Sequence, residues 1–200
     1  MKLNGSQTEL LLKFSNRDIS VIAALKEARA HVRAGKQEVY PYQAAALYIL
    51  AKPYNGKPVL EIGTYYGYTA YVMSLACPDS RIVTLNPTVW EAEEAAANLK
   101  DRNVVVMQWK SQDYLASFPD EMFDFIFIDG DHRKVAQDLS YWERLNDGGL
   151  MLLHDYTPLG APRHCPPVFE AVNEFADSLG RDPDVLIVDD ERVGMAGFYR

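Results

Sequence analysis

Short apolar runs alternate along the chain with longer segments in which apolar residues recur every three or four positions. A short apolar run predicts a buried strand, and the wider spacing predicts a helix with one apolar face. The sequence therefore predicts strands at residues 59–62, 81–85, 104–107, 123–128, 149–153, 185–188 and 195–199. It predicts helices at residues 18–34, 41–52, 68–76, 89–99, 135–145 and 168–179.

The order of these elements predicts the fold class. Strands that alternate with helices form a mostly parallel sheet with helices on both faces. Only a short turn separates the last two strands, whereas a parallel connection needs about a dozen residues or more. We therefore expect a Rossmann-like α/β fold with an antiparallel last strand. Residues 1–200 are expected to form a single domain, with 1–52 as an N-terminal helical cover and 58–200 as the core.

Composition and charge narrow the class of partner. The chain has 20 Lys and Arg against 28 Asp and Glu, so its net charge is −8, and it contains no basic run. These features argue against a nucleic-acid-binding surface. Cys77 and Cys165 form no metal-binding or disulfide pattern, and no apolar run approaches the length of a membrane span. We therefore expect a cytoplasmic protein without a membrane partner.

The stretch V-L-E-I-G-T-Y-Y-G-Y-T-A at residues 59–70 is the centre of the predicted fold. Gly63 and Gly67 bracket a turn between a buried strand and a helix. Glycine suits this turn because the backbone must bend sharply and approach a ligand closely, at the sheet edge where open α/β folds bind ligands. The G-x-x-x-G spacing differs from the dinucleotide fingerprint G-x-G-x-x-G and disfavours a dehydrogenase. An ordinary turn between a strand and a helix would use the same glycines.

Acidic and histidine side chains follow the fourth and fifth predicted strands. Asp129, Asp131 and His132 come after the fourth strand, and His154 and Asp155 come after the fifth. Because the two strands are expected to be neighbours, these side chains should lie close together at the carboxyl ends of the strands, where open α/β sheets have their binding sites. Carboxylates favour magnesium or manganese, and an imidazole also admits iron or zinc. A hydrogen-bond network without an ion would use the same residues.

Taken together, these motifs resemble the class I S-adenosylmethionine-dependent methyltransferases. The closest likeness is to the catechol-type O-methyltransferases, and the later motifs are similar to the antibiotic-sugar O-methyltransferases. The resemblance runs from about residue 41 to about residue 158. It implies a seven-stranded sheet with an antiparallel last strand and S-adenosylmethionine as the cofactor. It also implies a set of cofactor-binding residues, namely Glu61, Gly63, Tyr65, Gly67, Thr69, Asn86, Ser111, Gln112 and Asp129.

Some of these positions depart from the family or have a simpler interpretation. Asn86 stands where the family carries an acid that holds both ribose hydroxyls. Hydrogen bonds from the ribose to an amide are weaker than those to a carboxylate, by about 1 kcal/mol. It could equally be a turn residue beside Pro87. Ser111 and Gln112 match a pair that lies beside the adenine, but they would also suit a helix cap. Tyr156 stands where the catechol type has a neutral amide, and tyrosine is a poor substitute.

The resemblance also implies the metal ligands and the base. Acids at the positions of Asp129 and Asp155 bind magnesium in the resembling enzymes, and the sugar enzymes carry a further acid at the position of His154. The expected metal ligands are therefore Asp129, His154 and Asp155. His132 occupies the position of a catalytic lysine, and Asp131 that of a proposed catalytic acid, so either residue is a candidate base. Both could instead cap the helix that follows.

We therefore expect an enzyme that transfers a methyl group from S-adenosylmethionine to a hydroxyl of a small molecule, assisted by Mg²⁺ or Mn²⁺. One alternative is a metal-independent small-molecule methyltransferase with His132 or Asp131 as the base. Another is a catalytically inactive cofactor-binding module, which the amide of Asn86 would favour. No nucleic acid is expected as a partner, and a homodimer is left open. The proline-rich stretch 158–167 predicts a loop over the site and does not identify the acceptor.

Overall fold

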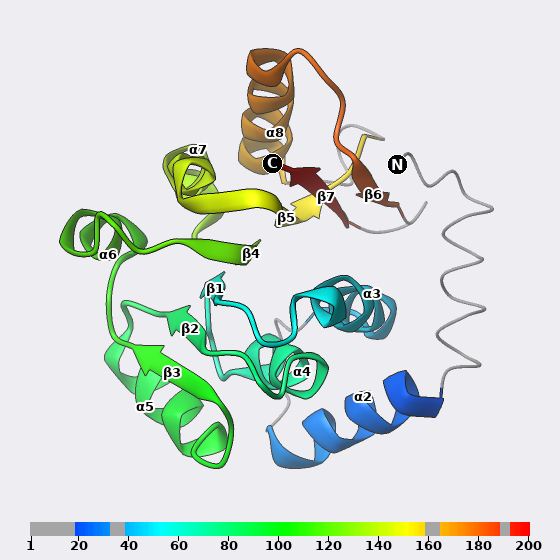
Figure 1. Ribbon diagram of the computed structural model, residues 1–200, viewed down its shortest axis with the longest axis vertical. Helices are drawn as coiled ribbons and strands as arrows, with labels where there is room; N and C mark the ends of the chain where they lie inside the picture. The colour runs from blue at the N-terminus through cyan, green and yellow to red at the C-terminus, as the bar shows by residue number, and fades with distance from the viewer. Residues whose placement is uncertain (1–18, 33–38, 159–164, 189–192) are drawn as a thin grey trace.

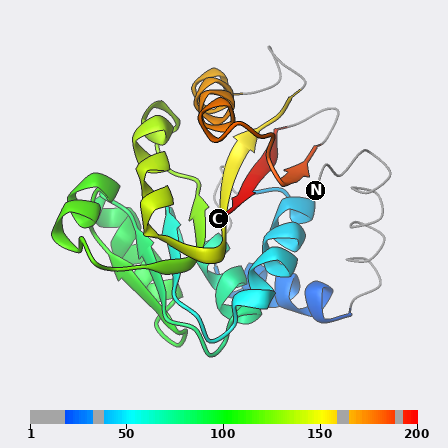
Figure 2. The ribbon, with the colours of Figure 1, turned by 45° about the horizontal axis from the view of Figure 1, so that its top comes forward.

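The computed structural model describes residues 19–32, 39–158, 165–188 and 193–200. Within them lies a seven-stranded sheet with the strand order β3-β2-β1-β4-β5-β7-β6 (Figure 1). The strands are β1 (Val59–Ile62), β2 (Ile82–Leu85), β3 (Val104–Met107), β4 (Phe123–Ile128), β5 (Leu145–Tyr156), β6 (Val185–Ile187) and β7 (Gly194–Tyr199). Strands β1 to β5 pair in parallel, whereas β7 is antiparallel to both β5 and β6. Figure 2 shows β7 between these two neighbours. The predicted fold class and terminal hairpin are confirmed.

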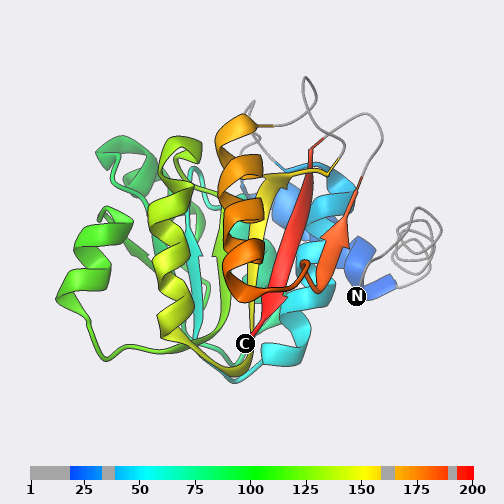
Figure 3. The same ribbon diagram turned by 90° about the horizontal axis from the view of Figure 1, so that it is seen from above.

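Helices cover both faces of the sheet. They are α2 (Ile19–His31), α3 (Pro41–Ala51), α4 (Tyr68–Ala76), α5 (Val89–Asn98), α6 (Ser111–Ser117), α7 (Val135–Asp138) and α8 (Pro166–Leu179). One apolar cluster joins α2, α3 and α4 to one face, and a second joins α6, α7 and α8 to the other. Figure 3 shows α7 and α8 in front of the sheet and α3 behind it. The helices expected to form an N-terminal cover therefore pack on the same face as α4.

The central strands β1 and β4 are buried on both faces, which explains why all but one residue of each is apolar. In β4, Phe125 and Phe127 belong to the cluster with α3 and α4, whereas Ile126 and Ile128 belong to the cluster with α7 and α8. Successive side chains of a strand point to opposite faces, so one short run supplies both cores. Each fully buried side chain of this size contributes roughly 1.5–3 kcal/mol. The well-packed sheet therefore holds the residues at its edge in fixed positions.

Three predicted boundaries were wrong. The predicted helix 135–145 is α-helical only through Asp138, and a 3-10 helix, Leu139–Arg144, continues it. Strand β5 begins at Leu145, before the predicted start at 149, because Leu145 pairs with Phe123 before the register shifts. The predicted loop 158–167 is also too long at its end, since α8 begins at Pro166; residues 159–164 of it lie outside the described residues.

The register of the sheet brings the ends of β1, β2 and β4 level with His154, near the end of β5. Ile62 at the end of β1 is paired with Leu85 of β2 and with Ile128 of β4. Ile128 is in turn paired with Leu153 of β5. The next residues of the four strands are Gly63, Asn86, Asp129 and His154. Residues far apart in the sequence therefore meet along one edge of the sheet.

Candidate active site

A cleft of about 640 Å³ opens at this edge of the sheet. Most of the expected site residues line it, namely Gly63, Tyr65, Thr69, Asn86, Asp129, Asp131, His132, His154 and Asp155. The other four expected residues, Glu61, Gly67, Ser111 and Gln112, do not line it. The acid and histidine cluster and part of the glycine turn therefore line the same cleft.

Both glycines of the turn have left-handed backbones, with φ +104° at Gly63 and +89° at Gly67. The expected reason for glycine at position 63 is corrected. A Cβ at Gly63 would lie 2.1 Å from the carbonyl oxygen of Asp129, and one at Gly67 would lie 2.8 Å from Cδ1 of Leu99. Glycine is therefore required by the close approach of the β4 end and of α5, whether or not a ligand is bound.

Glu61 on β1 is fully buried and lies below the cleft. Its Oε2 accepts a hydrogen bond of 2.5 Å from the hydroxyl of Thr84. The Thr84 hydroxyl lies 2.6 Å from that of Thr64, which lines the cleft. Burial raises the pKa of Glu61 to about 7, although hydrogen bonds from Thr69 and Thr84 oppose the rise. Glu61 is thus linked to the cleft through hydroxyl groups.

Two cleft residues have unusual backbone conformations. Tyr65, with φ +46°, and Asp155, with φ +61°, are the non-glycine residues of the described chain with positive φ. Such conformations are costly and often occur at functional sites. The ring of Tyr65 lies 4.0 Å, centroid to centroid, from that of Tyr66, which also lines the cleft. The turn after β1 thus presents aromatic side chains to this space.

Asn86, at the end of β2, is buried with both ends of its amide engaged. Its Oδ1 accepts a hydrogen bond of 3.0 Å from the backbone N–H of Thr88. Its Nδ2 donates one of 3.0 Å to Oε2 of Glu91, which also lines the cleft. Glu91 is not among the residues expected from the sequence. Its place, one helical turn after a strand end that lacks the expected acid, is a signal that could have identified it.

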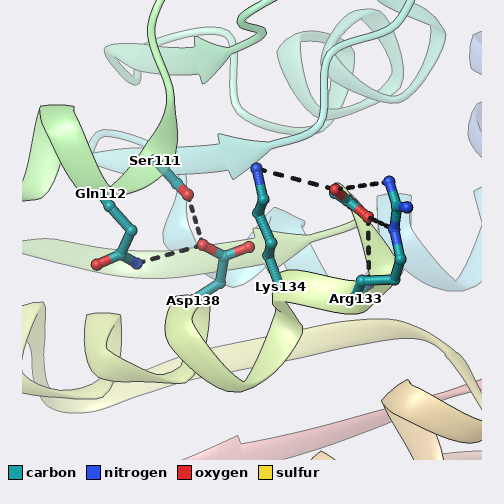
Figure 4. A network of polar contacts seen from close by, with 6 residues as sticks. Ser111, Gln112, Arg133, Lys134 and Asp138 are labelled. Atoms are coloured by element: carbon teal, nitrogen blue, oxygen red, sulfur yellow. Dashed lines mark hydrogen bonds and ion pairs between the residues drawn. The ribbon is translucent and has the colours of Figure 1, made fainter.

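Ser111 and Gln112 point away from the cleft, toward α7. The Ser111 hydroxyl donates a hydrogen bond of 2.5 Å to Oδ1 of Asp138, and Gln112 Nε2 lies 3.5 Å from the same oxygen (Figure 4). Gln112 Nε2 also donates to the carbonyl of Gln137 at 3.0 Å. In this structure the pair fixes α7 against α6. That the two residues contact the adenine stays a prediction.

Three side chains converge where β4 and β5 end. Donor atoms of Asp129, His154 and Asp155 all lie within 4.8 Å of one another. His154 Nδ1 is 3.1 Å from a carboxylate oxygen of each acid. Burial opposes a charge on His154, but the two acids outweigh it and raise its pKa to about 10. Burial likewise opposes a charge on Asp155, but His132 and His154 hold its pKa well below the usual range.

The two candidate bases differ in their surroundings. His132 Nε2 lies 2.5 Å from Oδ2 of Asp155, and this contact raises the pKa of His132. Asp131 caps the 3-10 helix His132–Lys134 by accepting a hydrogen bond of 3.2 Å from the backbone N–H of Arg133. The side chain of Arg133 binds the same carboxylate, and these contacts lower the pKa of Asp131 (Figure 4). The capping interpretation is therefore confirmed for Asp131.

Other residues complete the cleft or lie outside it. Tyr156 is buried in the core, where its hydroxyl donates a hydrogen bond of 3.1 Å to Asn173, so it does not face the cluster. Tyr40 lines the cleft just before α3, as does Val193 just before β7. Nothing in the local sequence marks Val193, because it reaches the cleft only through the pairing of β7 with β5. Gln43 fixes this segment by donating a hydrogen bond of 2.8 Å to the carbonyl of Val193.

Comparisons with known proteins agree with this geometry. Residues 60–156 match a family model described as a methyltransferase domain. A protein of Mycobacterium sp. (strain JLS) assigned as an O-methyltransferase is 26% identical over 198 residues, covering 94% of this chain and 87% of the relative. The catechol O-methyltransferase of Niastella koreensis is 32% identical over 126 residues, covering 58% of this chain and 57% of the relative.

Solved structures show the same fold. The O-methyltransferase from Bacillus cereus, in complex with SAH, matches with a TM-score of 0.68 and 20% identity, over 96% of this chain and 97% of that one. TomG from Streptomyces achromogenes, an O-methyltransferase involved in tomaymycin synthesis and in complex with SAM, matches with a TM-score of 0.64 and 20% identity, over 98% and 97%. At these identities the likeness establishes the fold alone.

The sheet topology and the strand-end cleft are those of the class I methyltransferase fold, and residues 60–156 match a methyltransferase domain. The chain is similar in sequence to proteins named as O-methyltransferases, over 94% of its length in one relative and 58% in the other. The predicted fold class is thereby confirmed, and the relatives are named as the predicted enzyme class. Among the described residues, no helix has the length and apolar character that crossing a bilayer requires.

Proposed function

We propose that this enzyme transfers the methyl group of S-adenosylmethionine to a hydroxyl of a small molecule, with the help of one divalent cation. The observation that carries the proposal is that β1, β2 and β4 end level with His154 of β5. This register places the glycine turn in one cleft of about 640 Å³ with the side chains of Asp129, His132, His154 and Asp155. A cleft of this size suits a cofactor with a small acceptor beside it.

The cofactor's place follows from the walls of the cleft. The methionine part would lie against the turn after β1, where Tyr65 and Thr69 line the cleft. The ribose would lie over the end of β2, near Asn86. The sulfonium methyl would then point toward the ends of β4 and β5. This order leaves the acid and histidine cluster for the acceptor, so that the reacting atoms can be aligned.

The donor set at the ends of β4 and β5 fits a divalent cation. Asp129, His154 and Asp155 would hold it, since two carboxylates and an imidazole suit manganese and, through their oxygens, magnesium. Both ring nitrogens of His154 are buried and lack a hydrogen bond of normal geometry among the described residues. Groups left in this condition are what a bound cation would satisfy. When bound, the cation would supply charge that stabilises the acceptor's oxygen after it loses its proton.

His132 is the proposed base. Its ring is 44% exposed at the cleft, and its contact with Asp155 fixes the imidazole in position. The ring would accept the hydroxyl proton as the oxygen attacks the methyl carbon and the carbon–sulfur bond breaks. Asp131 is disfavoured as a base because Arg133 lowers its pKa and holds its carboxylate.

A metal-independent reaction is the second candidate, and one observation favours it. Without an ion, the raised pKa of His154 makes the ring a cation at neutral pH. An imidazolium between Asp129 and Asp155 would partly neutralise both acids. His132 would then act as the base without a metal beside it. We also propose a cytoplasmic location, in keeping with the free thiols of Cys77 and Cys165.

The test is turnover of S-adenosylmethionine with a panel of hydroxylated small molecules, including catechols and sugars, followed by mass detection of the methylated product. Activity should fall with a chelator and return with magnesium or manganese. Asp155→Asn should lower turnover far more than it weakens binding of S-adenosylhomocysteine. Full turnover in chelator, together with an active Asp155→Asn variant, would reject the metal and favour the second candidate.

A further inference from the structure

We infer that Glu91, rather than Asn86, binds the ribose diol of the cofactor, and that Asn86 serves to position Glu91. This inference rests on the proposed function, since it assigns one part of the same cofactor site. It begins from the hydrogen bonds at the end of β2, where both ends of the Asn86 amide already have partners.

The amide of Asn86 is a poor match for a diol. A vicinal diol presents two O–H donors, which one carboxylate can accept with its two oxygens. Asn86 has a single acceptor oxygen, and that oxygen already accepts the N–H of Thr88 at 3.0 Å. This bond closes a local turn before α5, of the kind that asparagine commonly forms. The residue is only 4% exposed, so its side chain has little freedom to turn toward a ligand.

Glu91 has the properties that Asn86 lacks. It is half-buried in the first turn of α5 and lines the cleft, where the helix N-terminus favours a negative charge. The bond from Asn86 Nδ2, 3.0 Å long, uses one of about four acceptor positions on its carboxylate. In related α/β folds an acid after the second strand commonly binds the ribose. Here the acid comes from the helix, one turn later, and the amide holds it in place.

The proposal is tested by calorimetry with S-adenosylhomocysteine and with its analogue that lacks both ribose hydroxyls. Glu91→Gln removes the charge but keeps an oxygen that can accept the bond from Asn86, so the loop should remain folded. We expect binding of S-adenosylhomocysteine to weaken roughly tenfold or more. Binding of the analogue should be nearly unchanged. Glu94→Gln is the matched control, because it removes the same charge from an exposed position of the same helix.

A second variant separates this role from a structural one. Asn86→Asp alone would place a second carboxylate beside Glu91, at the present 3.0 Å contact, so it should weaken binding of S-adenosylhomocysteine. In the Glu91→Gln background this repulsion is absent, so the same substitution should change binding of S-adenosylhomocysteine little, because the buried side chain at position 86 does not reach the diol. The effect of Asn86→Asp thus depends on the charge of Glu91.

The outcomes are distinguishable. A wild-type protein that binds S-adenosylhomocysteine and a Glu91→Gln variant that binds it equally well would overturn the inference while leaving the proposed function in place. An equal loss for the analogue without ribose hydroxyls would overturn it too, since the effect would then be structural. A wild-type protein that does not bind S-adenosylhomocysteine would overturn the proposed function and this inference with it.

Discussion

Glu61 should make the stability of this enzyme depend on pH. The carboxyl group is fully buried on β1, and burial raises its pKa from 4.5 to about 7, against the opposing hydrogen bonds of Thr69 and Thr84. The folded protein therefore holds this proton more tightly than the unfolded chain does. Glu61→Gln removes the ionisation, while its amide oxygen can still accept the hydrogen bond from Thr84.

The direction and size of the effect follow from these two pKa values. Because the folded pKa is the higher one, the stability that the protonated Glu61 provides is complete below pH 4.5. It is lost as the pH rises through about 7. Each pKa unit corresponds to 1.36 kcal/mol, so the total loss is on the order of 3 kcal/mol. This is a large share of the roughly 5–15 kcal/mol that stabilises a typical domain.

The assay is urea unfolding of the cofactor-free protein at several pH values between 4.5 and 8. The free energy of unfolding of Glu61→Gln, relative to the wild type, should rise by about 3 kcal/mol across this range. Glu93→Gln, at an exposed position of α5, is the control and should follow the wild-type curve. Parallel curves for Glu61→Gln and the wild type would refute the reasoning, because they would mean that Glu61 titrates alike in the folded and unfolded states.

Four further substitutions test the site. Gly63→Ala should lower the free energy of unfolding by several kcal/mol in urea titrations, because its Cβ would lie 2.1 Å from the Asp129 carbonyl oxygen; wild-type stability would contradict this. His132→Gln should slow turnover of an identified acceptor by about a hundredfold or more, whereas Asp131→Ala should change it little; the reverse order would make Asp131 the base. Tyr156→Phe should cost about 1 kcal/mol in thermal unfolding and leave the affinity for S-adenosylhomocysteine unchanged, and weaker binding would place Tyr156 in the site.

The fold was predictable because its signals are local. The largely apolar sequence of β4 reflects burial on both faces, and the short turn between β6 and β7 permits only an antiparallel pair. The early start of β5 was not predictable in this way. It depends on the pairing of Leu145 with Phe123 and on a hydrogen bond of 3.0 Å from Asn146 to Asp124. These contacts join distant segments, and the periodicity of either segment alone does not contain them.

The site was predictable where it follows from the ends of the strands. Asp129 and His154 come together because β4 and β5 are parallel neighbours and Ile128 is paired with Leu153, and the order of the elements already implies that the two strands are parallel. The partners of other side chains were not predictable. Ser111 faces α7 because its hydroxyl donates a hydrogen bond to Asp138. Asp138 belongs to a different element, so the local sequence around Ser111 does not reveal this partner. The role of Asn86 likewise depends on a carboxylate whose distance the sequence does not give.

The measurement that tests the central claim most directly is calorimetric titration of the wild-type protein with S-adenosylmethionine and with S-adenosylhomocysteine. The proposed cofactor site at the ends of β1 and β2 predicts that both ligands bind saturably, with one site per chain, and that they compete. Binding should persist in chelator, since the proposed metal ligands Asp129, His154 and Asp155 lie at the acceptor end of the cleft. The absence of saturable binding of either ligand, at any concentration that the protein tolerates, would contradict the account.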